Sequence, residues 1–367
     1  MVIFSFFSGV GMLDLGFQEA GFEIVSVNEY EKSFMKAYQY ARKKQKKNIS
    51  FSCYYNGDIN DFIKPPLKQK TERQIETLRK KGELVGFIGG PPCPDFSVAG
   101  KNRGRNGENG KLAKSYVDVI NYYQPDFFLF ENVKGLIKTE QHKQYFNELK
   151  ASLQDNNYIL TEALLNALEF GVPQDRERVI LMGINVYSVL AIGLNHTNNT
   201  FKFPWNMHKT YDIDNIKNMT WPTTQRYIQY SKRKFRYDVP KELTAEYWFI
   251  KNDVYHHANR GDKFNVRSGL ERIENVEEGD VSRKSFKRLH RWRYSPTAAY
   301  GNNEVHLHPY RSRRLTVAEA MAIQSLPKWF ELPPDLALTE KFKMIGNGVP
   351  YLMAFELANT IRDFFQI

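Results

Sequence analysis

The sequence predicts an α/β protein built on a doubly wound sheet. Short apolar runs typical of buried strands alternate with helical patterns along the first half of the chain. The chain opens with a strand, a glycine loop and a helix, which is the arrangement of nucleotide-binding folds. Four reactive or acidic side chains, Glu29, Asp58, Cys93 and Glu131, each follow directly after a predicted strand. Parallel strands end at one edge of a sheet, so we expect these four groups to converge there.

Composition favours an intracellular protein with a polyanionic partner. The formal charge of +11 and the aromatic content of 14% suit binding to nucleic acid, with phosphates on cations and bases on rings. The chain has two cysteines, which predicts a reduced protein without a disulfide framework. No apolar run reaches the roughly 18 residues of a membrane span, and the apolar start lacks the basic region of a signal peptide.

The first two strands frame a predicted cofactor site. Val2 to Phe6 forms the first strand, and a glycine loop leads into a helix with an apolar side. Ile24 to Val27 forms the second strand, and Glu29 lies twenty residues beyond Gly9 (29 − 9). A carboxylate in that place accepts hydrogen bonds from a ribose diol. No P-loop lysine follows the glycines, which favours a nucleoside cofactor with little or no phosphate.

The stretch from Gly86 to Lys101 is the centre of the predicted chemistry. A buried strand ends at two glycines, and Pro91 and Pro92 then hold Cys93 at the carboxyl edge of the sheet. A lone cysteine is often a small buried hydrophobe. The polar, basic and glycine-rich residues that follow instead predict a cationic loop hinged behind a reactive thiol.

Further polar groups follow in the second half of the predicted sheet. Glu131 comes directly after the apolar strand Phe127 to Phe130. Residues 160–184 predict an antiparallel hairpin that contains Arg176 and Arg178. In a strand these two arginines point to the same face, where they form either a salt-bridged surface or a reader of anions and carbonyls.

From Val186 to Tyr310 the helical periodicity is lost. Two clusters, residues 225–237 and 283–293, mix Arg and Lys with aromatic side chains, which favours nucleic-acid contact over a merely variable surface. A helix over 316–324 with a capping box, and an amphipathic final helix, are predicted after this stretch.

Taken in order, FSGVGMLDLG, NEY, GDI, GGPPCPDFS, ENV, QDRER, RRLTVAEAMAIQSLP and GNGVP resemble the motifs of prokaryotic DNA cytosine-5 methyltransferases of the restriction-modification type. The resemblance covers nearly the whole chain except residues 186–291. It implies a Rossmann-like S-adenosylmethionine-dependent methyltransferase domain at 1–186, completed by 342–367. It also implies a smaller, irregular target-recognition domain at 187–341. Met12 and Asp95 stand where the family often has glycine and glutamine.

The resemblance assigns roles residue by residue. S-adenosylmethionine is the expected methyl donor, S-adenosylhomocysteine its product, and no metal is expected. The expected cofactor contacts are Phe7, Gly9, Val10, Gly11, Glu29, Tyr30, Asp58, Ile59, Leu112 and Asn347. The expected catalytic residues are Cys93, Glu131, Arg176 and Arg178. The expected DNA contacts are Ser97, Lys101, Arg103, Arg233, Arg236 and Arg291.

These roles describe a covalent mechanism. Cys93 adds to carbon 6 of a cytosine flipped out of duplex DNA, which activates carbon 5 toward the donor methyl group. Glu131 hydrogen-bonds ring nitrogen 3 and the exocyclic amine, while Arg178, with Arg176 beside it, steadies the carbonyl oxygen. The loop from Ser97 closes over the DNA.

Other functions compete with this one. A related branch methylates transfer RNA, but its cysteine-phenylalanine-threonine signature is absent here. A catalytically silent DNA-binding module does not require a thiol beside an acid. A nicotinamide-dependent dehydrogenase leaves the basic stretch and the Cys93 loop unexplained. We expect a cytoplasmic, nucleoid-associated monomer, with a restriction endonuclease acting on the same site as a candidate partner.

Overall fold

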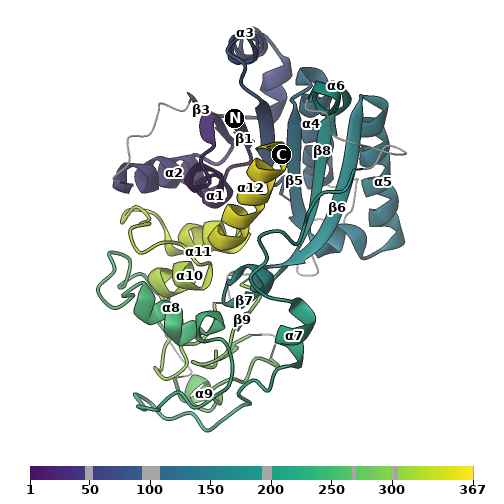
Figure 1. The fold of residues 1–367 in the computed structure, drawn as a ribbon. Coiled ribbons are helices and arrows are strands. Elements are labelled where there is room, and N and C mark those ends of the chain that lie inside the picture. Colours follow the sequence, from purple (N-terminus) through teal and green to yellow (C-terminus); the bar gives the residue numbers. More distant parts are fainter. Residues whose placement is uncertain are drawn as a thin grey trace.

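A seven-stranded mixed sheet organises the part of the chain that the structure describes (Figure 1). The computed structural model describes residues 1–45, 53–92, 108–191, 201–266, 270–283, 285–298, 300 and 305–366. The strand order is β3-β2-β1-β4-β5-β8-β6. The strands are β1 (Val2–Phe6), β2 (Glu23–Glu29), β3 (Cys53–Asn56), β4 (Val85–Gly89), β5 (Phe127–Val133), β6 (Tyr158–Asn166) and β8 (Glu177–Asn185). Neighbours from β3 to β5 are parallel, and β8 runs antiparallel between β5 and β6, so the predicted α/β sheet and its hairpin are confirmed.

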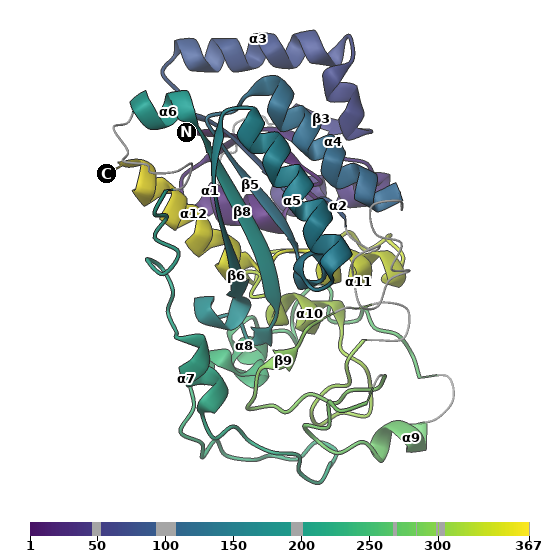
Figure 2. The same ribbon diagram turned by 90° about the vertical axis from the view of Figure 1, so that its right-hand side faces the viewer.

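Helices cover both faces of the sheet (Figures 1 and 2). One face packs against α1 (Met12–Glu19), α2 (Lys32–Lys44) and α12 (Tyr351–Gln366). The other face packs against α3 (Leu67–Lys80), α4 (Glu108–Tyr123) and α5 (Glu140–Asp155). Each strand alternates between the two cores: Phe127 and Leu129 of β5 face α1 and α12, whereas Phe128 and Phe130 face α4 and α5.

The last helix completes the first face of the sheet. On α1, a Cβ placed on Gly16 would lie 2.5 Å from the carbonyl carbon of Ala354 in α12. This close approach of two backbones requires glycine at that position. The expectation that the C-terminal helix packs beside the first helix is confirmed.

The described residues between 201 and 316 lie beyond one end of the sheet (Figure 2) and are irregular apart from short helices, which the predicted loss of helical periodicity did not anticipate. The remaining elements are α6 (Val186–Ala191), α7 (Ile213–Asn218), α8 (Ala245–Lys251), α9 (Leu270–Glu274), α10 (Val317–Ile323), α11 (Leu338–Asn347), β7 (Gln174–Asp175), β9 (Ser295–Pro296) and the 3-10 turns η1 (Ile59–Ile63), η3 (Lys134–Ile137), η4 (Ala167–Phe170) and η5 (Lys241–Leu243). Strands β7 and β9 pair in parallel and join the irregular part to the sheet. Among the described residues no helix is long and apolar enough to span a membrane.

The predicted boundaries at 186 and 341 stay a prediction. One apolar core crosses the second of them, because α8, α10 and α11 pack with Met12 and Leu15 of α1. Helix α10 begins with the predicted capping box, in which Thr316 and Glu319 each accept a hydrogen bond from the other's backbone N–H.

Candidate active site

A buried ion pair lies at the edge of the sheet where β5 ends. Glu131 lies opposite Ile180 of the antiparallel neighbour β8, and Arg178 lies two residues before Ile180, on the same face. Arg178 Nε lies 2.7 Å from Glu131 Oε1, and each residue is 7% exposed. Burial raises the pKa of Glu131 above its ordinary value, and the guanidinium of Arg178 opposes that rise. Glu131 is therefore a desolvated acid, and the register of β5 and β8 fixes its position beside Arg178.

The segment before Cys93 runs directly beside this acid. A Cβ placed on Gly90 would lie 2.6 Å from Glu131 Oε2, and Asn132 Nδ2 lies 3.4 Å from the carbonyl oxygen of Pro91. Glycine at position 90 lets the chain after β4 pass this close to the carboxylate. Cys93 itself, with Ser97, Lys101 and Arg103, lies outside the described residues.

A second acid lies at the same edge, at the end of β2. Glu29 Oε2 accepts a 2.7 Å hydrogen bond from Gly9 N, and Oε1 accepts one of 2.8 Å from Glu31 N. Burial raises the pKa of Glu29. Gly9 has a φ of +57°, and nothing lies within 4 Å of where its Cβ would be, so the glycine loop itself is open on that side. Such an acid beside an open glycine loop suits a ribose diol.

The other residues expected at the cofactor site lie in varied surroundings. Asp58 follows β3 and caps η1 through Asn60 N, and Gly57 N donates to Glu29 O, which holds the ends of β2 and β3 together. Tyr30 is 70% exposed at this edge. The side chains of Val10 and Ile59 are buried in apolar cores, and Phe7 and Leu112 pack partly against one. Asn347 ends α11 and is exposed.

Comparison with known proteins identifies the family. A family model for C-5 cytosine-specific DNA methylase matches residues 1–363. The chain belongs to the C-5 cytosine-specific DNA methylases. It is 49% identical over 365 residues to the type II methyltransferase M.NmeDI of Neisseria meningitidis serogroup C, covering 100% of this chain and 84% of that protein. It is 30% identical to the type II methyltransferase M.MthTI of Methanothermobacter thermautotrophicus, covering 99% and 97%.

Solved structures share the fold of this methylase. A putative DNA modification methyltransferase encoded within a prophage (E. coli) matches with a TM-score of 0.65 at 20% identity, over 100% of both chains. The Dnmt2 methyltransferase of S. pombe matches with a TM-score of 0.58 at 13% identity, over 99% of both chains. The methylase is thus an enzyme of the S-adenosylmethionine-dependent DNA cytosine-5 class. Glu29 fits that donor, because each of its carboxylate oxygens accepts one backbone N–H and can accept a further hydrogen bond.

Beneath the glycine loop of the methylase lies a polar network that the sequence did not reveal. Asp14 of α1 is fully buried and accepts hydrogen bonds of 2.7 Å from Ser5 Oγ and 2.9 Å from Tyr38 Oη. Arg42 Nη2 donates to Gly11 O at 2.9 Å. An aspartate in a helix is ordinarily exposed to solvent, and nothing in the sequence indicated that Asp14 is buried. The network fixes the loop from below.

Arg176 differs from the sequence expectation in its position. It lies between β7 and β8, outside both strands, and is 1% exposed. Its guanidinium donates to the carbonyl oxygens of Ala298 at 3.2 Å, Gly346 at 2.8 Å and Gly348 at 3.1 Å. Of the two arginines, therefore, only Arg178 faces Glu131 from a strand. Arg176 instead connects the glycine turn around Asn347 to the irregular part through hydrogen bonds.

The glycine turn also explains the unusual Met12. A Cβ placed on Gly348 would lie 2.2 Å from Met12 Sδ. Methionine at the position where the family often has glycine thus packs its thioether against the turn at the other end of the chain.

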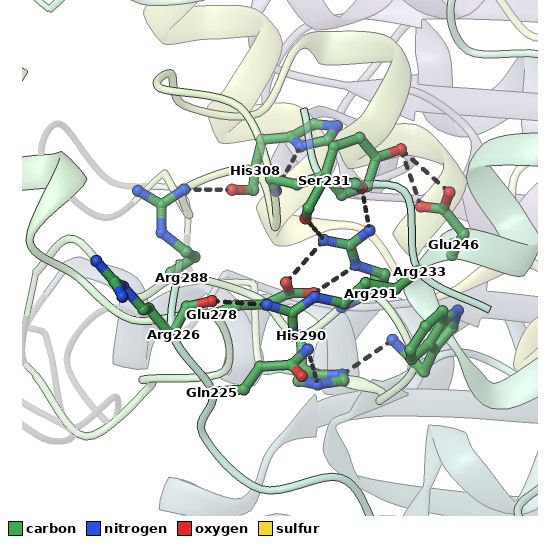
Figure 3. Close-up of polar contacts among 12 residues, drawn as sticks. Gln225, Arg226, Ser231, Arg233, Glu246, Glu278, Arg288, His290, Arg291 and His308 are labelled. Carbon is green, nitrogen blue, oxygen red and sulfur yellow. Dashed lines mark hydrogen bonds and ion pairs between the residues drawn. The ribbon is translucent and has the colours of Figure 1, made fainter. Parts of the chain in front are cut away.

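Arg291 also differs from the expectation, because it lies in the interior (Figure 3). It is 3% exposed and forms a two-pronged ion pair with Glu278, with Nε–Oε1 at 2.7 Å and Nη2–Oε2 at 2.8 Å. This placement favours a structural role in place of the phosphate contact. Arg233 is half-buried and donates to Arg226 O at 2.9 Å, whereas Arg236 is exposed.

Within the described ranges, no group of three or more His, Cys, Asp or Glu side chains is placed to hold an ion.

Proposed function

We propose that this methylase acts on one specific sequence in duplex DNA and methylates carbon 5 of a flipped cytosine through a covalent adduct with Cys93. The observation that carries this proposal is the buried Glu131–Arg178 pair beside Gly90 and Pro91, the residues that lead to Cys93. Binding alone does not require a desolvated acid next to a thiol-bearing loop.

Each residue has a role in the reaction. The thiolate of Cys93 adds to carbon 6, and cysteine suits this step because it is both a strong nucleophile and a good leaving group. Glu131 donates a proton to ring nitrogen 3, for which a raised pKa is favourable, and accepts from the exocyclic amine. Arg178 holds Glu131 in place and donates to the carbonyl oxygen of the base. Bound S-adenosylmethionine supplies the electrophilic methyl group that carbon 5 attacks. Loss of the proton from carbon 5 then expels the thiolate.

The cofactor and partner expectations extend this proposal. Glu29 binds the ribose hydroxyls of the donor, Asp58 and Tyr30 contact its adenine, and Asn347 closes the site. The names of the relatives support a type II restriction-modification role, and so a restriction endonuclease that acts on the same sequence. The proposed enzyme works as a monomer.

Covalent trapping tests the mechanism. We expect the wild-type chain to form a denaturation-resistant complex with PCR-made duplex DNA in which 5-fluorocytosine replaces cytosine, since fluorine blocks the final elimination. Cys93→Ser abolishes trapping and methyl transfer. Glu131→Gln lowers methyl transfer by about 100-fold or more. Glu177→Gln, next to Arg178 but paired with Lys134 at the surface, is the matched control and keeps activity.

Two results would contradict the proposal. Full methyl transfer by Cys93→Ser would exclude the covalent step. Transfer to bulk transfer RNA but not to a duplex DNA library would move the enzyme to the RNA branch of the fold.

A further inference from the structure

The segment 225–238, here called the basic loop, has two faces of different character. It runs between α7 and α8 along the edge of the molecule farthest from the sheet (Figures 1 and 2). From 231 to 238, exposed and half-buried residues alternate strictly, which is the burial pattern of an extended chain. The exposed positions are Lys232, Lys234, Arg236 and Asp238.

The inward face of the basic loop is fixed by specific contacts (Figure 3). Arg291 donates from Nη1 to Ser231 O and from Nη2 to Ser231 Oγ, both at 2.7 Å, while Glu278 holds Arg291 from the other side. Gln225 exchanges two 2.9 Å backbone hydrogen bonds with Glu278. Arg233 links the two arms of the loop through Arg226 O. A buried ion pair thus sets the path of the loop.

Aromatic packing holds the second arm in the same way. The rings of Phe235 and Tyr237 contact Trp292, with centroid distances of 5.9 Å and 5.7 Å. In the first arm, the ring of Tyr227 lies 3.8 Å from the guanidinium carbon of buried Arg288. Because the inward side chains are held, the outward ones need little further ordering when a ligand binds.

The outward face carries unpaired cations and an apolar tip. No carboxylate in the described ranges forms an ion pair with Arg226, Lys232, Lys234 or Arg236, whereas Lys36, Lys80, Lys114 and Lys134 on the larger part are each paired. At the tip, Ile228 and Tyr230 are 50% and 65% exposed. The backbone of Tyr230 is left-handed, with φ of +55°, and is held by a 2.8 Å hydrogen bond to Tyr310 O.

We propose that the basic loop reads duplex DNA in two ways. Lys232, Lys234 and Arg236 contact successive phosphates of one strand, because alternate side chains of an extended chain are about 6.6 Å apart, comparable with neighbouring phosphates. Ile228 and Tyr230 enter the groove and contact base edges and thymine methyl groups. Arg291 and Arg233 are positioning residues behind this face. The inference rests on the proposed function, since it assumes a duplex DNA substrate.

Salt dependence of binding tests the phosphate contacts. The site methylated by the wild-type chain is first defined by bisulfite sequencing of plasmid DNA, which tests the proposed function separately. Binding of that duplex is then measured over a range of salt concentrations. The triple variant Lys232→Ala, Lys234→Ala, Arg236→Ala loses about 0.9 in the slope of log K against log salt for each contact removed. It still methylates the same sequence.

A charge-matched control lies at the opposite end of the molecule. Arg73→Ala, Lys80→Ala, Lys81→Ala on and just after α3 removes the same charge from exposed positions and leaves the slope near that of wild type (Figure 1). Equal slopes for the wild type and the loop triple variant, or equal losses in both triple variants, would overturn the phosphate assignment.

Sequence preference tests the tip. The double variant Ile228→Ser, Tyr230→Ser keeps the salt slope. The ratio of its affinity for the cognate site to its affinity for single-mismatch sites falls by about tenfold or more. Unchanged binding of S-adenosylhomocysteine verifies that each variant is folded. A tip variant with undiminished sequence preference would overturn the groove assignment.

Discussion

Glu29 organises the glycine loop with its carboxylate and is expected to bind the cofactor through the same group. Each of its oxygens accepts one backbone N–H, from Gly9 and from Glu31, and each keeps one lone pair. A ribose presents two adjacent hydroxyl donors that match those two lone pairs. The side chain holds the glycine loop in its observed shape, and we expect the same carboxylate to bind the ribose of the cofactor.

Glu29→Ala is expected to weaken S-adenosylhomocysteine binding by about 10- to 100-fold, because two hydrogen bonds to a charged acceptor are lost. Calorimetric titration measures this change. DNA affinity at low salt stays close to that of the wild type, since Glu29 is not among the residues proposed to contact DNA. Glu31→Ala, which removes a neighbouring exposed carboxylate, is the control. An unchanged affinity in Glu29→Ala would remove Glu29 from the cofactor site.

The buried arginines mark the limit of sequence reasoning at the residue scale. The pairing of Arg178 with Glu131 was within reach, because both follow from strand ends that apolar runs reveal. Arg291 and Arg288 were not, since their partners are a glutamate thirteen residues away and a set of backbone carbonyls. The sequence of a basic cluster does not distinguish an arginine that faces solvent from one that is buried.

At the scale of elements, apolar runs bounded by glycine or polar residues predicted the strands well. Strand β1 matches its predicted range, and β4 ends at the predicted glycine. Strands β2 and β5 extend further than predicted because Glu29 and Glu131 belong to them. A polar side chain in a strand interrupts the apolar signal even though the backbone ladder continues. The functional acids thus lie where the pattern underestimates the strand.

The contact of α1 with α12 leads to a prediction about glycine. Gly16→Ala would gain helix propensity in an exposed helix, but here the new methyl group meets the backbone of α12 at 2.5 Å. We expect a loss of about 1–3 kcal/mol in the free energy of unfolding. Urea denaturation measures it. Gly261→Ala is the control, because nothing lies within 4 Å of the added methyl group there. Equal stability of the two variants would contradict the close approach of the helices.

At the scale of the whole molecule, segments far apart in sequence meet in a buried polar joint. Gln174 Nε2 donates to Gln324 Oε1 at 3.1 Å, and Gln324 Nε2 donates to Ile345 O at 2.6 Å. Ala298 N donates to Gln174 Oε1 at 3.0 Å. With Arg176, these groups connect the link before β8, the irregular part and the glycine turn near the end of the chain. Apart from Arg176 Nε, which is buried without a hydrogen-bond partner among the described residues, the polar groups of this joint are paired, and such pairing favours one arrangement of the parts.

Substitutions of Arg176 can distinguish a role in the buried polar joint from a role in catalysis. Two of its hydrogen bonds go to the carbonyls of Gly346 and Gly348, on either side of Asn347. Arg176→Met keeps the length of the side chain but leaves these buried carbonyls without their donor, which costs about 1–3 kcal/mol for each. We therefore expect a lower melting temperature together with weaker S-adenosylhomocysteine binding, because the turn that carries Asn347 loses its support. Arg176→Lys, which keeps a donor, recovers part of both. The catalytic role that the sequence predicts for Arg176 would instead lower kcat while melting temperature and cofactor affinity stayed at wild-type values, and that result would overturn the supporting role.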